Sequence, residues 1–488
     1  MKKDIYTCPY VKLCGACQTL HLSYTEQLKK KQAFVEKLFK RICKVNPIIG
    51  MENPTHYRNK IHATFGFGPK KSIVSGLYQT STHKLVSVEN CLLEHESAEP
   101  ILCTIRQLMK KYRLTPYNDI SHTGFLRHVL IRCGVYTNQI MLVLVTGSPI
   151  FPSRSQFLKD LRQAHPEITT IIQNINPRHT SMILGQEQKV LFGKGFIEDD
   201  LCGYRFRISP HSFYQVNTVQ TEKLYQIAIE MAQLTGKERL IDAYCGTGTI
   251  GIIASKHTSS TLGIELNPVA VKDAIINAKR NHCNNIHFVT ADAGKFMVEM
   301  ANSGESVDVV ILDPPRAGSD EAFLSSLCTL APKKVVYISC NPKTQKRDVE
   351  YLIAKGYILK QVQPVDLFPH TDSIETVVLL SHKTPDSYIH IDVDFGEGAG
   401  KIPTDKIIER ANLHKPKERI TYKMIQEYIE EKYGFKVHTS YIAEVKRSLG
   451  LPMHDAPNSV EQLKNPQKHP TPEKVTAIKD ALKHFEFI

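Results

Sequence analysis

The sequence lacks any apolar run approaching the roughly 20 residues that a helix needs to span a bilayer. Its first residues, Met-Lys-Lys-Asp-Ile-Tyr, contain no signal-peptide core. A disulfide framework is also not expected for the twelve cysteines, because a reducing compartment keeps thiols free. These absences exclude membrane-embedded proteins and secreted disulfide scaffolds, and we expect a cytoplasmic protein with no membrane partner.

The net charge of +13 is unevenly distributed along the 488 residues. Residues 385–488 carry 16 Lys and Arg against 16 Asp and Glu, so the whole excess lies in residues 1–384. An excess of basic side chains attracts phosphate groups. Phosphate contacts are therefore expected from residues 1–384, and the chain is long enough for about three or four domains.

Three stretches in the second half contain short β-branched runs typical of buried parallel strands. They lie at residues 307–318, 334–342 and 368–380. Asp313 and Cys340 follow the first two runs, and Glu375 lies just before the third. In an open α/β sheet the carboxyl ends of strands form the ligand crevice, so a thiol nucleophile and a carboxylate base would meet there.

A glycine turn lies upstream of these runs. Residues 239–252 read Arg-Leu-Ile-Asp-Ala-Tyr-Cys-Gly-Thr-Gly-Thr-Ile-Gly-Ile, which predicts a strand, a turn and the start of a helix. Two further strands would end at Glu265, where an acid can bind ribose hydroxyls, and at Asp292. This context favours a nucleotide-type site over the simpler interpretation, in which Cys340 is a small buried side chain.

Five motifs taken together resemble the RNA 5-methyluridine (uracil-C5) methyltransferase family, in chain order over about residues 6–382. Members use S-adenosylmethionine to methylate C5 of a uridine in 23S rRNA or tRNA. The motifs are Ser-Phe-Tyr-Gln-Val-Asn (212–217), Asp-Ala-Tyr-Cys-Gly-Thr-Gly (242–248), Asp-Pro-Pro-Arg-Ala-Gly (313–318), Ser-Cys-Asn-Pro (339–342) and Phe-Pro-His-Thr with Glu-Thr-Val (368–377).

The resemblance implies a role for particular residues. Cys340 matches the nucleophile and Glu375 the base. Two positions depart from the family pattern: Thr249 stands where many members have Asn, and Ser373 stands where many have a second His, which leaves His370 as the imidazole beside the base. The cofactor-binding positions are matched by Gln215, Tyr244, Glu265, Asp292 and Asp313.

The chemistry of uracil methylation requires the same two catalytic groups. C5 is a poor nucleophile, so a thiolate such as Cys340 must add at C6 to push electron density onto C5. After methylation a base such as Glu375 must remove the C5 hydrogen before the cysteine can leave. Arg316 would meet a phosphate or O4. Phe213 or Tyr214 would stack on a uracil flipped out of its helix.

Cysteines near the N-terminus form a separate pattern. Cys8, Cys14 and Cys17 are closely spaced, and Cys91 is the candidate for a fourth ligand. Such spacing suits either zinc or an iron–sulfur cluster. In family members that carry a cluster, three cysteines at this spacing and one distant cysteine hold [4Fe-4S], so the resemblance favours the cluster, with zinc as the alternative.

The expected fold class is α/β, with a Rossmann-like S-adenosylmethionine-dependent methyltransferase domain. Residues 1–56 are expected to form a Cys-motif segment followed by an amphipathic helix at 21–44, whose lysines at 29–31 face solvent. Residues 57–207 are predicted to form a mixed β-rich domain, which the resemblance implies contacts RNA, and residues 208–384 the catalytic domain. Residues 385–488 are predicted to form a linker (386–403) and a small helical domain with helices at 420–433 and 439–449.

The sequence therefore predicts a monomeric uridine-C5 methyltransferase acting on 23S rRNA, because the cluster motif is commoner among relatives that act on rRNA. The same reaction on tRNA is the alternative within this class. A non-catalytic RNA-binding metalloprotein is an alternative of another class, and intact Cys340 and Glu375 argue against it. A cytosine-C5 enzyme would also need a cysteine, but its usual Pro-Cys motifs are absent.

Overall fold

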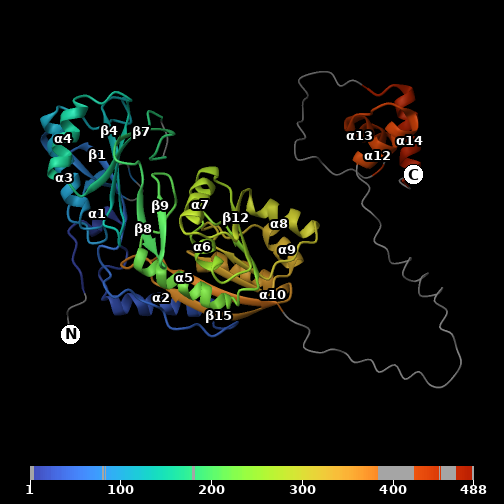
Figure 1. Ribbon diagram of the computed structural model, residues 1–488, viewed down its shortest axis with the longest axis horizontal. Coiled ribbons are helices and arrows are strands. Elements are labelled where there is room, and N and C mark those ends of the chain that lie inside the picture. The colour runs from blue at the N-terminus through green and yellow to red at the C-terminus, as the bar shows by residue number, and fades with distance from the viewer. Residues whose placement is uncertain are drawn as a thin grey trace. The chain divides into compact units, whose positions relative to one another are not determined.

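The computed structural model describes residues 5–79, 82, 84–178, 182–382, 422–449, 451 and 469–485. The chain divides into two compact units, Met1–Tyr388 and Ile389–Ile488 (Figure 1). The linker predicted at 386–403 lies outside the described residues. Among the helices that the structure describes, none is long and apolar enough to cross a membrane.

A seven-stranded sheet forms the first half of the larger unit, in the order β3-β2-β1-β4-β5-β6-β7. Neighbouring strands are antiparallel, except for β5 and β6, which run parallel. Helices α3 (Ala98–Lys111) and α4 (Arg154–Ala164) pack on one face of this sheet (Figure 1). The strands are β1 (Lys60–Phe67), β2 (Ile73–Tyr78), β3 (Leu85–Ser87), β4 (Leu126–Cys133), β5 (Ile140–Thr146), β6 (Ile168–Ile175) and β7 (Glu187–Phe192).

A two-stranded sheet of β8 (Ile197–Leu201) and β9 (Tyr204–Ile208) joins the two halves of this unit. Its buried side chains belong to one apolar core with Leu130 of the first sheet and Leu224 of α5 (Thr218–Ala232). The first sheet and the second half of this unit therefore share a continuous core.

The second half contains a seven-stranded sheet in the order β12-β11-β10-β13-β14-β16-β15. The first five strands of this order are parallel, and β16 is antiparallel to both of its neighbours. The strand order reverses between β10 and β13, which is where open α/β sheets bind ligands. The strands are β10 (Arg239–Ala243), β11 (Ser260–Glu265), β12 (Ile286–Thr290), β13 (Val309–Leu312), β14 (Lys334–Ser339), β15 (Tyr357–Val365) and β16 (Glu375–His382).

Helices cover both faces of this second sheet. Alternate residues of β13 show why: Ile311 joins the core with α5, α6 (Thr249–Ser255) and α7 (Pro268–Arg280), whereas Val310 joins the core on the opposite face. The opposite face is covered by α8 (Ala293–Asn302), α9 (Glu321–Leu330) and α10 (Pro342–Ala354). Asn or Asp side chains cap five of these helices at Asn217, Asn267, Asp292, Asp320 and Asn341.

The predicted N-terminal helix is shorter than expected, because α2 covers only Tyr24–Phe39. A reciprocal capping box between Ser23 and Glu26 fixes its start. After the helix the chain extends, and the backbone N–H of Ile49 donates to the carbonyl of Pro364 in β15 at 3.1 Å. This extended pairing ends the helix before residue 44 and keeps α2 beside β15 (Figure 1).

The smaller unit contains three described helices rather than the two that the sequence predicted. They are α12 (Tyr422–Tyr433), α13 (Thr439–Ser448) and α14 (Pro472–His484). Ile425, Ile442 and Ile478 are fully buried, one from each helix. The third helix has a sequence signal that was missed, since Pro472 occupies its first turn.

Candidate active site

The glycine turn after β10 is open toward a ligand. Tyr244 and Gly246 adopt left-handed backbone angles, with φ of 62° and 56°. A Cβ atom added at Gly246 would meet nothing within 4 Å, so the backbone there is accessible. At Gly251, in α6, a Cβ would lie 2.9 Å from Oδ2 of Asp242. The same Asp242 oxygen accepts the Gly251 N–H at 2.7 Å, which fixes the start of the helix against β10.

Glu265 lies beside this turn, at the end of β11. Its Oε2 accepts the N–H of Gly246 at 3.0 Å, and its Oε1 accepts the N–H of Asn267 at 2.8 Å. A carboxylate offers about four acceptor positions. Since two of them are used by the backbone, the others remain available for the hydroxyls of a ribose.

Tyr244, in the turn, and Asp292 are close enough to interact electrostatically. Burial raises the pKa of Tyr244 to about 12, and the carboxylates of Asp320 and Asp292 also raise it. Asp292 lies two residues beyond β12, where its Oδ1 accepts the N–H of Lys295 at 3.0 Å and caps α8. This hydrogen bond holds the Asp292 carboxylate in one orientation. The sequence did not predict that Asp292 caps a helix.

Gln215 and Asp313 meet around the buried hydroxyl of Tyr225. Burial, followed by the Asp313 carboxylate, raises the pKa of Tyr225, while hydrogen bonds from Thr249 and Gln215 lower it. The Tyr225 hydroxyl lies 3.3 Å from Oγ1 of Thr249. Thr249, one of the two departures from the family pattern, is thus a partner of Tyr225 next to two predicted cofactor-binding residues.

Cys340 and Glu375 lie at adjoining ends of antiparallel strands. Ser339, the last residue of β14, pairs with Thr376 of β16, so the residues next in line are Cys340 and Glu375. Gln345 fastens this end of the ladder: its Nε2 donates to the carbonyl of Thr376 at 3.1 Å, and its Oε1 accepts the Thr376 hydroxyl at 2.5 Å. Asp313 directly follows the parallel neighbour β13.

These three acidic groups interact electrostatically. Burial raises the pKa of Asp313 to about 7. Burial and then the Asp313 carboxylate raise the pKa of Glu375 well above its ordinary value. Burial, then Glu375 and then Asp313 raise the pKa of the Cys340 thiol to about 11, while Arg316 lowers it. Buried acidic groups with raised pKa values, two of them also affected by a neighbouring carboxylate, are typical of sites where protons are moved.

The aromatic residues of the 212–217 motif have different environments. Phe213 is 64% exposed, and its carbonyl accepts the Thr247 hydroxyl at 3.3 Å, which holds it against the glycine turn. Tyr214 is 5% exposed and belongs to the apolar core. The hypothesis that Tyr214 could stack on a flipped base is therefore wrong, and Phe213 alone is accessible for this contact.

The segment before Glu375 is anchored to α2, which the sequence did not predict. Lys31 was expected at the solvent, but its side chain is 4% exposed. Its Nζ lies 2.7 Å from Oδ1 of Asp366 and donates to the carbonyl of Phe368 at 3.0 Å. The prediction was wrong because a run of three lysines is typical of an exposed surface. In α2, however, every fourth residue from 27 to 39 is buried, and Lys31 is one of them.

His370 belongs to the same anchor. Its side chain is fully buried, and Nδ1 lies 3.1 Å from Nε2 of Gln27. Its backbone N–H donates to Oε1 of Gln27 at 2.9 Å, with a left-handed φ of 67°. His370 is thus held by α2, and burial lowers its pKa. Its observed contacts position the segment that leads into Glu375.

The four predicted metal ligands lie in one neighbourhood. Cys17 and Cys91 pack against the same small apolar cluster. Burial raises the pKa of Cys17 to about 12, and Cys91, Cys14 and Cys8 also raise it, so these four thiols are close enough to interact. Within the described part of the chain, however, no group of three or more His, Cys, Asp or Glu residues is arranged to hold a metal ion.

Comparisons with known proteins cover most of this chain. Residues 23–383 match the family model of tRNA (uracil-5-)-methyltransferases. An uncharacterized RNA methyltransferase of Staphylococcus aureus is 40% identical over 381 residues, which cover 77% of this chain and 84% of that protein. A similar protein of Halalkalibacterium halodurans is also 40% identical over 381 residues, covering 77% of this chain and 83% of its own length.

A solved structure is similar over the same region. The tRNA (uracil-54, C5)-methyltransferase of Pyrococcus abyssi, in complex with S-adenosyl-L-homocysteine, has a TM-score of 0.62 and 25% sequence identity. The similarity covers 77% of this chain and 87% of that protein. The chain therefore belongs to the tRNA (uracil-5-)-methyltransferase family and is an S-adenosylmethionine-dependent RNA (uracil-C5-)-methyltransferase.

Proposed function

We propose that this enzyme methylates C5 of a specific uridine in 23S rRNA, with Cys340 as nucleophile and Glu375 as base. The observation that carries the catalytic roles is the convergence of Cys340, Glu375 and Asp313 at neighbouring strand ends, beside the open glycine turn. The choice of 23S rRNA rests on the N-terminal cysteine pattern. The proposal includes a monomeric protein in the cytoplasm, where RNA is available and thiols stay reduced.

The reaction begins when Cys340, having lost its thiol proton, bonds as a thiolate to C6 of the uracil and the C5=C6 electron pair moves toward C5 and O4. S-adenosylmethionine would supply the methyl group: the bond from the methyl to the sulfonium sulfur would break as the methyl bonds to C5, with its electron pair staying on sulfur to leave S-adenosylhomocysteine. Glu375 then takes the hydrogen of C5 as a proton. The electron pair of the broken C–H bond restores C5=C6, and the C6–S bond breaks to release Cys340.

The remaining residues bind and orient the reactants in this proposal. Glu265 would accept ribose hydroxyls at its unused acceptor positions, next to the accessible backbone of Gly246. Gln215, Tyr244, Asp292 and Asp313 would complete the cofactor site. Phe213, exposed and tied to the glycine turn, would stack on the flipped uracil.

Mapping of 5-methyluridine in cells that lack this chain tests the substrate. We expect mass spectrometry to show loss of 5-methyluridine from 23S rRNA, with tRNA unchanged, and restoration by the intact gene but not by a Cys340→Ala version. Transfer to tRNA is the second candidate, because the similar Pyrococcus abyssi enzyme is a tRNA (uracil-54, C5)-methyltransferase. Loss from tRNA alone would favour it, and loss from neither RNA would contradict both.

The reactivity of Cys340 should depend steeply on pH. Its pKa is raised to about 11, so the thiolate fraction should increase roughly tenfold per pH unit between pH 7 and 10. Peptide-resolved alkylation by iodoacetamide measures this rate. In Glu375→Gln the profile should shift to lower pH, because a carboxylate that raises the thiol pKa has been removed. An unshifted profile would show that Glu375 does not act on the thiol.

We also propose that Cys8, Cys14, Cys17 and Cys91 hold a [4Fe-4S] cluster, with zinc as the alternative. The electrostatic proximity of the four thiols supports this assignment. A cluster would join the N-terminal segment to the chain around Cys91, while the methylation chemistry uses none of these residues. Its first role would therefore be structural.

Anaerobically purified protein should contain about four iron and four sulfide per chain, since four thiolates hold such a cluster. Cys91→Ser should lose iron and sulfide and weaken RNA binding, because the N-terminal segment would lose its attachment. Cys103→Ser, a substitution at a partly buried cysteine of α3, should keep both. If the wild-type protein contained zinc and no sulfide, the four cysteines would be assigned to a zinc site and the cluster assignment would be wrong.

A further inference from the structure

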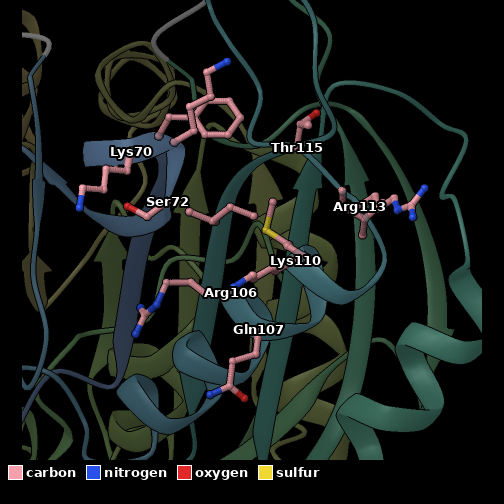
Figure 2. A pocket seen from close by; sticks show the side chains of 12 residues that line it. Lys70, Ser72, Arg106, Gln107, Lys110, Arg113 and Thr115 are labelled. Atoms are coloured by element: carbon pink, nitrogen blue, oxygen red, sulfur yellow. The ribbon is translucent and has the colours of Figure 1, made fainter.

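A basic hollow lies in the first sheet domain, between the turn from β1 to β2 and the end of α3. Figure 2 shows Lys70 on one side and Arg113 on the other, with Lys110 of α3 between them. The hollow has a volume of about 580 Å³. Its lining residues are Phe67, Lys70, Lys71, Ser72, Ile73, Arg106, Gln107, Met109, Lys110, Arg113, Leu114 and Thr115.

The lining is cationic and contains no carboxylate. Among its five basic residues, Arg106 is neutralised by Glu99, with Nη2 2.5 Å from Oε1. The other four, Lys70, Lys71, Lys110 and Arg113, form no ion pair with any residue that the structure describes. A concave surface with four uncompensated positive charges attracts a polyanion.

Two tight turns present three of these four charges, and the fourth, Lys110, lies in α3. Lys70 and Lys71 have left-handed φ angles of 55° and 59°, and Arg113 has one of 54°. Hydrogen bonds close both turns: the Ser72 N–H donates to the carbonyl of Pro69 at 3.1 Å, and the Leu114 N–H to that of Met109 at 2.8 Å. Left-handed backbone at non-glycine residues is costly and gathers at ligand-binding sites.

An aromatic side chain completes the hollow. Phe67, the last residue of β1, is 54% exposed. Exposed aromatic rings beside basic groups are what single-stranded nucleic acid uses, since bases stack on the ring while phosphates meet the cations. A site for a lipid surface would instead have several protruding apolar side chains on a flat face. A site for an acidic peptide would need the basic groups but not the exposed aromatic ring of Phe67.

We propose that this hollow binds the phosphodiester backbone of the substrate RNA, outside the catalytic site. No residue assigned above to catalysis or to cofactor binding lines it. The inference rests on the proposed function, because it takes the methylated RNA as the ligand. It assigns part of the net positive charge of residues 1–384 to a defined phosphate site.

The test compares two double variants of the full chain that lose the same charge. Lys70→Ala/Lys110→Ala removes one lysine from the turn between β1 and β2 and one from α3. The control, Lys111→Ala/Lys159→Ala, removes two exposed lysines of the same domain outside the hollow, one of them bound to Asp160 at 2.5 Å. RNA dissociation constants are measured from 50 to 300 mM salt, with thermal unfolding and S-adenosylmethionine binding as controls of folding.

The plot of log affinity against log salt has a negative slope. Loss of two phosphate contacts should make this slope less steep by about 1.4 to 1.8. The same relation predicts roughly 10- to 30-fold weaker RNA binding near 0.15 M salt for the hollow variant only. In methyl transfer, KM for RNA should rise by a similar factor while kcat at saturating RNA stays within about twofold, because the catalytic residues are untouched.

Equal RNA affinity and salt slope in the two variants would overturn the hollow as an RNA site. Wild-type protein that binds RNA but methylates none would contradict the proposed function instead, and the comparison of binding would still report on the hollow. Co-sedimentation with phosphatidylserine vesicles tests whether the hollow binds lipid instead of RNA. Vesicle binding lost only in the hollow variant, with RNA affinity unchanged, would assign the surface to lipid and overturn the proposal.

Discussion

Cys340→Ala should abolish methyl transfer to RNA, lowering the rate by more than about 1,000-fold, because alanine lacks the thiol that forms the proposed bond to C6. Binding of S-adenosylmethionine and of RNA should remain close to wild type, since the thiol contributes little contact area. Transfer of a radiolabelled methyl group measures the rate. Equilibrium dialysis and filter binding measure the two affinities.

A matched substitution separates loss of the nucleophile from general disturbance of the catalytic domain. Cys328, in α9, is also partly buried, and burial raises the pKa of its thiol as it does for Cys340. Cys328→Ala should therefore keep most of the methyl transfer. If Cys340→Ala retained substantial turnover, the nucleophile would have to be sought elsewhere.

Glu375→Gln should convert the enzyme into a trap for its own substrate. Addition of Cys340 and methylation of C5 do not need the carboxylate, but elimination of the cysteine requires removal of the C5 hydrogen. Gln has nearly the same size as Glu, so residue 375 can keep its place opposite Val365 in the sheet. We expect turnover to fall by about 100-fold or more, together with a methylated protein–RNA adduct that survives a denaturing gel.

The adduct should depend on Cys340. The double variant Cys340→Ala/Glu375→Gln should give no adduct, because the sulfur that forms the covalent bond is missing. An adduct that persists in the double variant would identify another point of attachment. An adduct without the transferred methyl group would mean that Glu375 acts before methylation, and turnover near wild type would show that another group removes the proton.

Much of the catalytic half could be predicted because its signals are local. Short apolar runs ending in polar turns predicted strands ending near Asp313 and Cys340, and β13 and β14 end one residue before each of them. The glycine turn was recognisable because the short turn between a strand and a helix requires glycines at fixed positions. The motifs of the family then related Cys340 to Glu375, which periodicity alone could not do.

Contacts between distant parts of the chain were not predictable in this way. Lys31 and Asp366 are separated by 335 positions, and nothing in either local sequence identifies the other as its partner. Tyr214 and Phe213 are adjacent in one motif, yet only the packing of the shared core decides that the first is buried. Helix boundaries failed for a similar reason, because pairing with β15 ends α2 early.

The anchor between α2 and the segment before Glu375 also has a consequence for synthesis. Lys31 leaves the ribosome long before Asp366, its buried partner at 2.7 Å. At roughly 5 to 20 residues per second, translation of the intervening 335 residues takes about 20 to 70 seconds. During that interval α2 exposes Val35 and Phe39, which are fully buried in the finished protein. The nascent chain is therefore a candidate client for chaperones, and methylating activity should arise only after residue 375 has emerged.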